Sequence, residues 1–289
     1  MIAITGASGQ LGRLVIGALL DAGVPASELV AAVRSPAKVA DLVARGVQVQ
    51  EADYAKPDTL ARAFAGVDRL LLISGTEVGA RAAQHQNVVD AAQRAGIGFI
   101  AYTSVARAED SPLTLAADHR QTEAAIRASG IPFAFLRNGW YTENYTAYLG
   151  QTLQQGMILG SAHDGRFSPA PRADYAAAAA VVIAGEGHEG AIYELGGDEA
   201  FTMAELTAEI TRQSGREVVY RDLSSEEHVR TLVGFGVPEV LAAMLAEYDS
   251  AIARGYLLVQ SGDLSRLIGR PTTPLGAAIA AALSAHVQA

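Results

Sequence analysis

The chain alternates short apolar runs with segments in which apolar residues recur every three or four positions. A run of consecutive apolar residues predicts a buried strand, and the wider spacing predicts an amphipathic helix. The predicted strands are 2–5, 29–33, 47–51, 70–73, 99–103 and 133–136. The predicted helices between them are 11–22, 36–44, 59–64, 81–95 and 115–128. Repeated strand–helix units indicate an α/β fold with a doubly wound parallel sheet.

The first predicted strand is followed without a spacer by a glycine-rich turn. Its residues are Gly6, Ala7, Ser8, Gly9, Gln10, Leu11 and Gly12. Gly6 lets the chain leave the strand, Gly9 lets the backbone approach a pyrophosphate, and Gly12 lets the helix pack closely on the sheet. The free N–H groups of the first helical turn would face an anion. The turn therefore predicts a dinucleotide site, although such turns also occur for purely steric reasons.

After residue 137 the pattern changes, because aromatic and polar residues replace the apolar runs. Helices are predicted at 173–184, 203–213 and 239–252, and short strands at 192–195 and 218–221. The alanine-rich run 176–184 is too short to span a membrane and predicts a core helix. We expect a Rossmann domain over 1–140 and a smaller substrate or lid domain over 141–289, with some segments returning to the sheet.

The composition excludes several classes of site and partner. The 289 residues include no cysteine, which excludes disulfides, thiolate metal sites and a cysteine nucleophile. The histidines lack close metal-ligand spacing, so we expect no metal site. The net charge of −9 argues against nucleic acid as a partner. No apolar run reaches the roughly 20 residues of a membrane span, so we expect a cytoplasmic protein without a membrane partner.

Functional residues should follow the strands, because ligands of open parallel sheets bind beyond the carboxyl ends of the strands. Arg34 follows the second strand, where an enzyme that selects NAD usually carries an acid. A guanidinium suits a 2′-phosphate, and Lys38 lies one helical turn further on. We therefore expect NADP rather than NAD. The alternative is a solvated arginine at the start of a helix.

Polar or small residues also follow the third and fourth strands. Asp53 and Tyr54 come where an adenine would lie, although Asp53 could equally cap a turn or helix. The fourth strand is followed by Ser74, Gly75 and Thr76. These small residues let the chain pass near the nicotinamide half of a dinucleotide, or they form an ordinary turn.

Several of these segments together resemble the NmrA-like atypical short-chain dehydrogenase/reductases. The segments that carry the resemblance are residues 6–12, Arg34, residues 53–54, the strand that ends at Ser74, and residues 101–104, 136–141 and 267–275. The resemblance covers nearly the whole chain. Within the family, the chain looks most like the NADPH-dependent quinone oxidoreductase group, with triphenylmethane reductase as a close relative.

The resemblance implies a Rossmann domain that holds NADPH, a smaller, mainly helical C-terminal domain and a quinone in the cleft between them. It places the glycine turn on the pyrophosphate and Arg34 on the 2′-phosphate. It places two further segments along the cofactor, and their residues are Ser74, Gly75, Thr76, Asn138, Gly139, Trp140, Tyr141, Thr142 and Glu143.

The chain departs from most short-chain dehydrogenases at the helix after the fifth strand. Those enzymes carry a Tyr-x-x-x-Lys pair there for proton donation, but residues 118–123 contain neither Tyr nor Lys. A quinone reduced by hydride yields a phenolate-like oxygen whose pKa, by analogy with tyrosine, is about 10, so water or a modest donor suffices. The candidate donors or pocket walls are Ser104, His119 and Tyr141, and none is assigned as catalytic. His119 could equally face solvent, and Tyr141 could simply pack in a core.

We therefore expect an enzyme that reduces quinones with NADPH by direct hydride transfer, without flavin, metal or a Tyr-Lys dyad. The alternatives are an NADP-binding sensor that controls a protein partner, and a reductase of dyes or imines. A sugar-nucleotide epimerase is a weaker alternative because that chemistry normally needs the missing dyad. The expected partner is a small-molecule quinone, and we also consider a homodimer.

Overall fold

The core of the protein is a seven-stranded parallel sheet with the strand order β3-β2-β1-β4-β5-β6-β8. The structure, a computed structural model, describes residues 1–77 and 79–288. The strands are β1 (Ile2–Thr5), β2 (Leu29–Val33), β3 (Gln48–Glu51), β4 (Arg69–Leu72), β5 (Phe99–Val105), β6 (Phe133–Asn138) and β8 (Ala191–Leu195). The strand order reverses direction between β1 and β4, so the predicted doubly wound α/β fold is confirmed.

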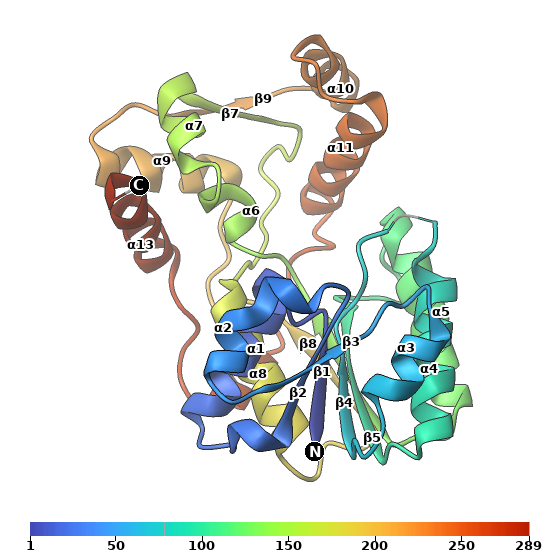
Figure 1. Cartoon of the computed structure of the whole chain (residues 1–289). Helices are drawn as coiled ribbons and strands as arrows, with labels where there is room; N and C mark the ends of the chain where they lie inside the picture. Colours follow the sequence, from blue (N-terminus) through green and yellow to red (C-terminus); the bar gives the residue numbers. More distant parts are fainter. Residues whose placement is uncertain (78, 289) are drawn as a thin grey trace.

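Successive residues of each strand point to opposite faces of the sheet and so supply two cores. In β1, Ile2 and Ile4 belong to one buried cluster and Ala3 to the other. The first face is covered by α1 (Gln10–Asp21), α2 (Ala40–Ala44), α8 (Arg172–Ala184) and α12 (Asp263–Ile268). The opposite face is covered by α3 (Pro57–Ala63), α4 (Arg81–Ala95) and α5 (Thr114–Ala128) (Figure 1).

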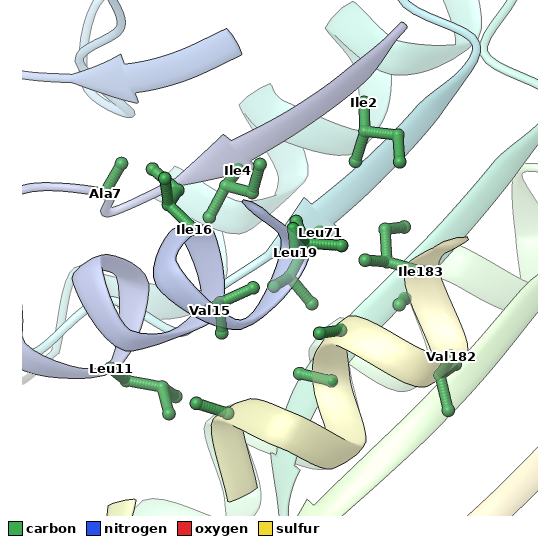
Figure 2. Packing of buried hydrophobic residues seen from close by; sticks show 14 of the residues in the cluster. Ile2, Ile4, Ala7, Leu11, Val15, Ile16, Leu19, Leu71, Val182 and Ile183 are labelled. Carbon is green, nitrogen blue, oxygen red and sulfur yellow. The ribbon is translucent and has the colours of Figure 1, made fainter. Parts of the chain in front are cut away.

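Small side chains allow α1 and α8 to pack side by side on the first face (Figure 2). Val15 and Leu19 of α1 are fully buried there, and α8 contributes a row of buried alanines. The prediction that the alanine-rich run is a core helix is therefore confirmed. At the start of α1, a Cβ atom on Gly12 would lie only 2.6 Å from the Gly6 carbonyl oxygen. A side chain at Gly12 would force the helix away from the turn.

The remaining elements form a layer beyond the carboxyl ends of the strands (Figure 1). Its helices are α6 (Glu143–Thr146), α7 (Leu149–Gln155), α9 (Met203–Ser214), α10 (Ser225–Gly234), α11 (Glu239–Ala253) and α13 (Leu275–Gln288). Its strands β7 (Met157–Gly160) and β9 (Val219–Asp222) form a parallel pair. This layer has its own buried cluster, which includes Phe167, Leu206 and Ile252. Because β8 pairs with β6 and both α8 and α12 pack on the first face of the sheet, the domain division at residue 140 stays a prediction.

The structure contains elements that were not predicted, the helices α6, α7, α10, α12 and α13 and the strand β7, and it differs locally from the predicted ones. The predicted helix 36–44 is divided into a 3-10 helix, η2 (Pro36–Val39), and α2. Val39 has φ −129° and ψ 31°, outside the helical region, and its side chain is fully buried. A further 3-10 turn, η1 (Ala26–Glu28), precedes β2. Within the described residues, no helix has the length and apolar character needed to cross a membrane.

The close approach of α1 to the turn predicts opposite effects for two alanine substitutions in this helix. Gly12→Ala should lower the free energy of unfolding by about 1–3 kcal/mol, because its Cβ would overlap the backbone of Gly6 and Ala7. Gly17→Ala is the matched control, since nothing lies within 4 Å of its Cβ position. It should stabilise the protein by up to about 1 kcal/mol. Denaturant unfolding measures both, and equal effects would contradict the packing argument.

Candidate functional site

The glycine turn joins β1 to α1 and leaves backbone N–H groups free at the start of the helix. Gly6 has φ +60°, a conformation that favours glycine, and the Gly9 amide donates to the Gly6 carbonyl at 2.9 Å. Gly9 is the N-cap residue of α1 and provides no side-chain hydrogen bond to the first helical turn. The N–H groups of that turn and the helix dipole therefore favour an anion in front of them.

A cavity of about 480 Å³ lies in front of this turn, and we call it the glycine-turn cavity. It is lined by thirteen of the predicted residues, Gly6, Ser8, Gly9, Gln10, Leu11, Gly12, Arg34, Asp53, Tyr54, Ser74, Gly75, Thr76 and Tyr141. It is also lined by residues that the sequence analysis did not assign, Ala52, Ile73, Glu77, Gln84, Thr103 and Arg172. Segments from several strand ends thus meet at one site, as the topology of a parallel sheet dictates.

Tyr54 ties together the ends of two neighbouring strands beneath the cavity. Its hydroxyl lies 2.5 Å from Thr5 Oγ1 and 2.8 Å from the Ile73 carbonyl oxygen. Burial raises the pKa of Tyr54 well above its usual range, so the phenol stays neutral. The adjacent Asp53 carboxylate accepts a hydrogen bond from the Ala55 amide at 3.0 Å. Its turn-capping role is therefore confirmed, and its contact with an adenine stays a prediction.

Arg34 lies at the rim of the cavity, where its side chain is 67% exposed. Its Nη1 donates to Glu77 Oε1 at 2.8 Å, and Gln84 Nε2 donates to Glu77 Oε2 at 2.6 Å. The guanidinium is therefore already paired with a carboxylate. An anion that binds at Arg34 must displace Glu77 or share the guanidinium with it. Lys38 is exposed and does not line the cavity.

His85 and Arg81 of α4 hold the loop that carries the small residues after β4. The Gly75 amide donates to His85 Nε2 at 2.9 Å, and His85 Nδ1 lies 2.9 Å from Thr122 Oγ1. Arg81 donates to the Gly75 carbonyl at 2.7 Å and pairs with Asp118 at 3.0 Å. Burial, reinforced by the charge of Arg81, lowers the pKa of His85 to about 3. The imidazole of His85 therefore stays neutral, so its Nε2 can accept the hydrogen bond from the Gly75 amide.

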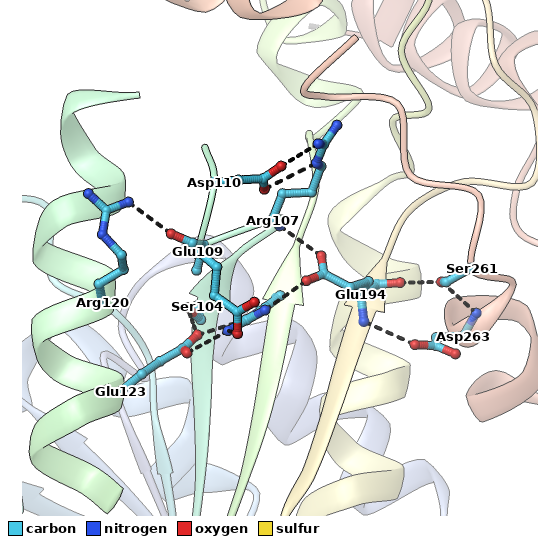
Figure 3. Close-up of polar contacts among 11 residues, drawn as sticks. Ser104, Arg107, Glu109, Asp110, Arg120, Glu123, Glu194, Ser261 and Asp263 are labelled. Carbon is cyan, nitrogen blue, oxygen red and sulfur yellow. Dashed lines mark hydrogen bonds and ion pairs between the residues drawn. The ribbon is translucent and has the colours of Figure 1, made fainter. Parts of the chain in front are cut away.

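Two of the three candidate proton donors lie outside the cavity lining, with their polar atoms in contact with other side chains. Ser104 donates to Glu123 at 2.6 Å (Figure 3). Glu123 in turn pairs with the buried Arg137 at 2.8 Å. His119 Nδ1 lies 2.7 Å from the Tyr102 hydroxyl. His119 is 6% exposed, so the alternative that it faces solvent is wrong. Burial lowers the pKa of His119 to about 3, which keeps it neutral.

The third candidate, Tyr141, lines the cavity and has a fixed orientation. Asn138 Nδ2 donates to its hydroxyl at 3.0 Å, and the Arg172 guanidinium lies 4.4 Å from the centre of its ring. The ring also packs against Tyr175, with the centroids 5.2 Å apart. Burial raises the pKa of Tyr141, so its phenol is neutral. Because Asn138 is the donor in their hydrogen bond, Tyr141 keeps its own proton for another acceptor.

The predicted residues outside the cavity lining support the segment that carries Tyr141. A Cβ atom on Gly139 would lie 2.9 Å from the backbone of β8, and the Glu143 carboxylate accepts from the Arg172 amide at 2.9 Å. Trp140 packs against Tyr248 of α11, with ring centroids 5.0 Å apart. Asn138 and Thr142 of this segment are buried, and the remaining predicted residue, Ala7, is buried in the glycine turn. Within residues 1–77 and 79–288, no cluster of His, Asp or Glu is arranged to hold a metal ion.

Residues 1–266 match the model of the NmrA-like family. The chain belongs to this family. The predicted resemblance is therefore confirmed, and it extends over most of the sequence. The NmrA-like chain is 51% identical over 279 residues to quinone oxidoreductase 2 of Escherichia coli (strain K12). The alignment covers 96% of this chain and 97% of that relative.

Solved structures agree with the family assignment. The NmrA-like chain has a TM-score of 0.95 and 50% identity with the crystal structure of the NADPH-dependent quinone oxidoreductase QOR2 from Escherichia coli complexed with NADPH. That match covers 98% of this chain and 100% of the other. The Citrobacter sp. triphenylmethane reductase complexed with NADP(H) gives a TM-score of 0.93 and 42% identity, over 98% of this chain and 100% of the other.

Proposed function

We propose that this chain is an NADPH-dependent quinone oxidoreductase that works by direct hydride transfer. The observation that carries the proposal is 50% identity, with a TM-score of 0.95, to a quinone oxidoreductase solved with NADPH. The match extends over both chains almost completely, so it includes the glycine-turn cavity and the layer above it. A quinone is the substrate class that this relationship supports.

The residues of the glycine-turn cavity suit the parts of NADPH. The pyrophosphate lies against the first turn of α1, where free N–H groups and the helix dipole favour negative charge. Arg34 binds the 2′-phosphate and exchanges its contact with Glu77 for that phosphate. Asp53 and Tyr54 lie beside the adenine, and residues 74–76 and Tyr141 follow the nicotinamide half. NADPH, when bound, supplies the hydride.

The protein contributes orientation and a hydrogen bond to the oxygen that is reduced. Of the candidate donors, Tyr141 is the one that lines the cavity, and its phenolic proton is available there. Ser104 and His119 are held by Glu123 and Tyr102. Because a reduced quinone oxygen is a weak base, a neutral phenol is a sufficient partner without the lysine of the usual dyad. A cytoplasmic location and a homodimer stay predictions from the sequence.

The direct test is oxidation of NADPH by the purified protein with small quinones, followed by nicotinamide absorbance. The proposal predicts turnover that depends on the quinone, with no added flavin or metal. Tyr141→Phe should lower kcat by less than about 100-fold, because no strong general acid is required. Tight NADPH binding with no oxidation by any quinone would contradict the proposal and would favour a sensor that responds to the cofactor.

The pairing of Arg34 with Glu77 predicts how the protein selects its cofactor. Arg34→Ala should weaken NADPH binding by about 10- to 150-fold and leave NADH binding nearly unchanged, since charged hydrogen bonds to the 2′-phosphate are lost. Glu77→Gln should strengthen NADPH binding by up to about fivefold, because it removes a competing carboxylate. Calorimetric titration with both nucleotides measures these effects.

Arg62→Ala is the control for this prediction, because Arg62 is an exposed arginine on α3 outside the cavity lining. Arg62→Ala should change neither the NADPH affinity nor the NADH affinity. If Arg34→Ala weakens NADH and NADPH equally, Arg34 does not bind the 2′-phosphate.

A further inference from the structure

A second cavity, of about 840 Å³, lies in the layer above the sheet, between α7 and β7 on one side and α10 and α11 on the other. We call it the α7–α11 groove. Its lining includes Tyr145, Tyr148, Ile158, Phe235 and Leu245. Its volume is within the range of about 300–1,000 Å³ that is typical of small-molecule sites. The groove is therefore large enough for a ligand and is mainly apolar and aromatic.

Large apolar side chains are unusually exposed in and around this groove. Phe235 is 73% exposed and Tyr148 64%, and Val240, at the start of α11, is 83% exposed. Soluble proteins rarely leave such a group uncovered unless it binds something. Among the described residues, no Asp, Glu, Lys or Arg lines the groove, and its polar members are neutral amides and hydroxyls. The lining therefore suits an uncharged, apolar ligand rather than a charged peptide.

The groove and the glycine-turn cavity lie on either side of one short segment. Tyr141 lines the cavity, and Asn144 and Tyr145 of α6 line the groove. Arg172 lines the cavity and donates from Nη2 to Asn144 Oδ1 at 3.3 Å. Figure 1 shows α6 between the carboxyl edge of the sheet and α7. The lining of the groove therefore begins three residues along the chain from Tyr141.

We propose that the α7–α11 groove binds the hydrocarbon side chain of a quinone, such as a chain of isoprenoid units. This inference rests on the proposed function and adds a substrate class to it: the preferred substrates are quinones with an apolar tail, not bare rings. The quinone ring lies at Tyr141, and the tail follows α6 to the aromatic rings of Tyr148 and Phe235. A neutral, apolar groove whose lining begins three residues from Tyr141 favours a tail over a protein partner.

The experiment compares kcat/KM for one quinone ring that carries zero, one or two isoprenoid units, with saturating NADPH. The wild type should gain at least about tenfold in kcat/KM from the bare ring to the longest tail, mainly through a lower KM. Phe235→Asp places a charge in the groove at an exposed position, so the fold should tolerate it. This variant should lose that gain and keep the kcat/KM of the bare quinone.

Val43→Asp is the matched control, because it introduces the same charge at an exposed apolar position on α2, away from the groove. Val43→Asp should keep the increase in kcat/KM from the bare quinone to the longest tail. Equal kcat/KM for bare and tailed quinones, or an equal loss for both in Phe235→Asp, would overturn the groove assignment while leaving the proposed function intact. Failure of every quinone would instead reject the proposed function. A change from dimer to monomer in Phe235→Asp during sedimentation, with the tail preference unchanged, would identify the groove as a contact between two copies.

Discussion

The close contact between the start of α1 and the end of β1 is the constraint on which the site depends. Gly12 lies so near the turn that a Cβ atom would be 2.7 Å from the Cα of Ala7. This approach directs the first turn of the helix toward the cavity at the carboxyl edge of the sheet. Helix packing and anion binding therefore depend on the same glycine. If α1 moved to make room for a side chain at Gly12, the free N–H groups of its first turn would move as well.

Neutral polar groups hold the other side of the cavity. Tyr54 joins the ends of β1 and β4, and His85 accepts a hydrogen bond from Gly75 in the following loop. Burial keeps both side chains uncharged. The charged pair of Arg34 and Glu77 lies instead at the exposed rim. The site thus combines a fixed interior for orientation with a rim whose contacts can be exchanged for those of a phosphate.

The sequence predicts the sheet and the glycine turn because both follow from local patterns, apolar runs and glycine spacing. It does not predict that Glu77 pairs with Arg34 or that Arg172 stacks on Tyr141, because these contacts join residues 43 and 31 positions apart. The helices α6, α7, α10, α12 and α13 and the strand β7 were also missed. Apolar residues of α7, α13 and β7 contact a separate core formed by distant segments, so no single stretch shows the whole pattern. The groove beside them could not be predicted for the same reason.

The most direct test of the account is calorimetric titration of NADPH into Gly9→Val, compared with the wild type. Gly9 has φ −79° and ψ 171°, which any residue adopts, and its Cβ position lies 3.2 Å from the Gly6 carbonyl oxygen, so the variant should fold with a small local shift of the turn. Its branched side chain would occupy the approach to the first turn of α1. The denaturation midpoint of Gly9→Val should change little, and NADPH binding should be lost. A folded Gly9→Val protein that binds NADPH as tightly as the wild type would contradict the account.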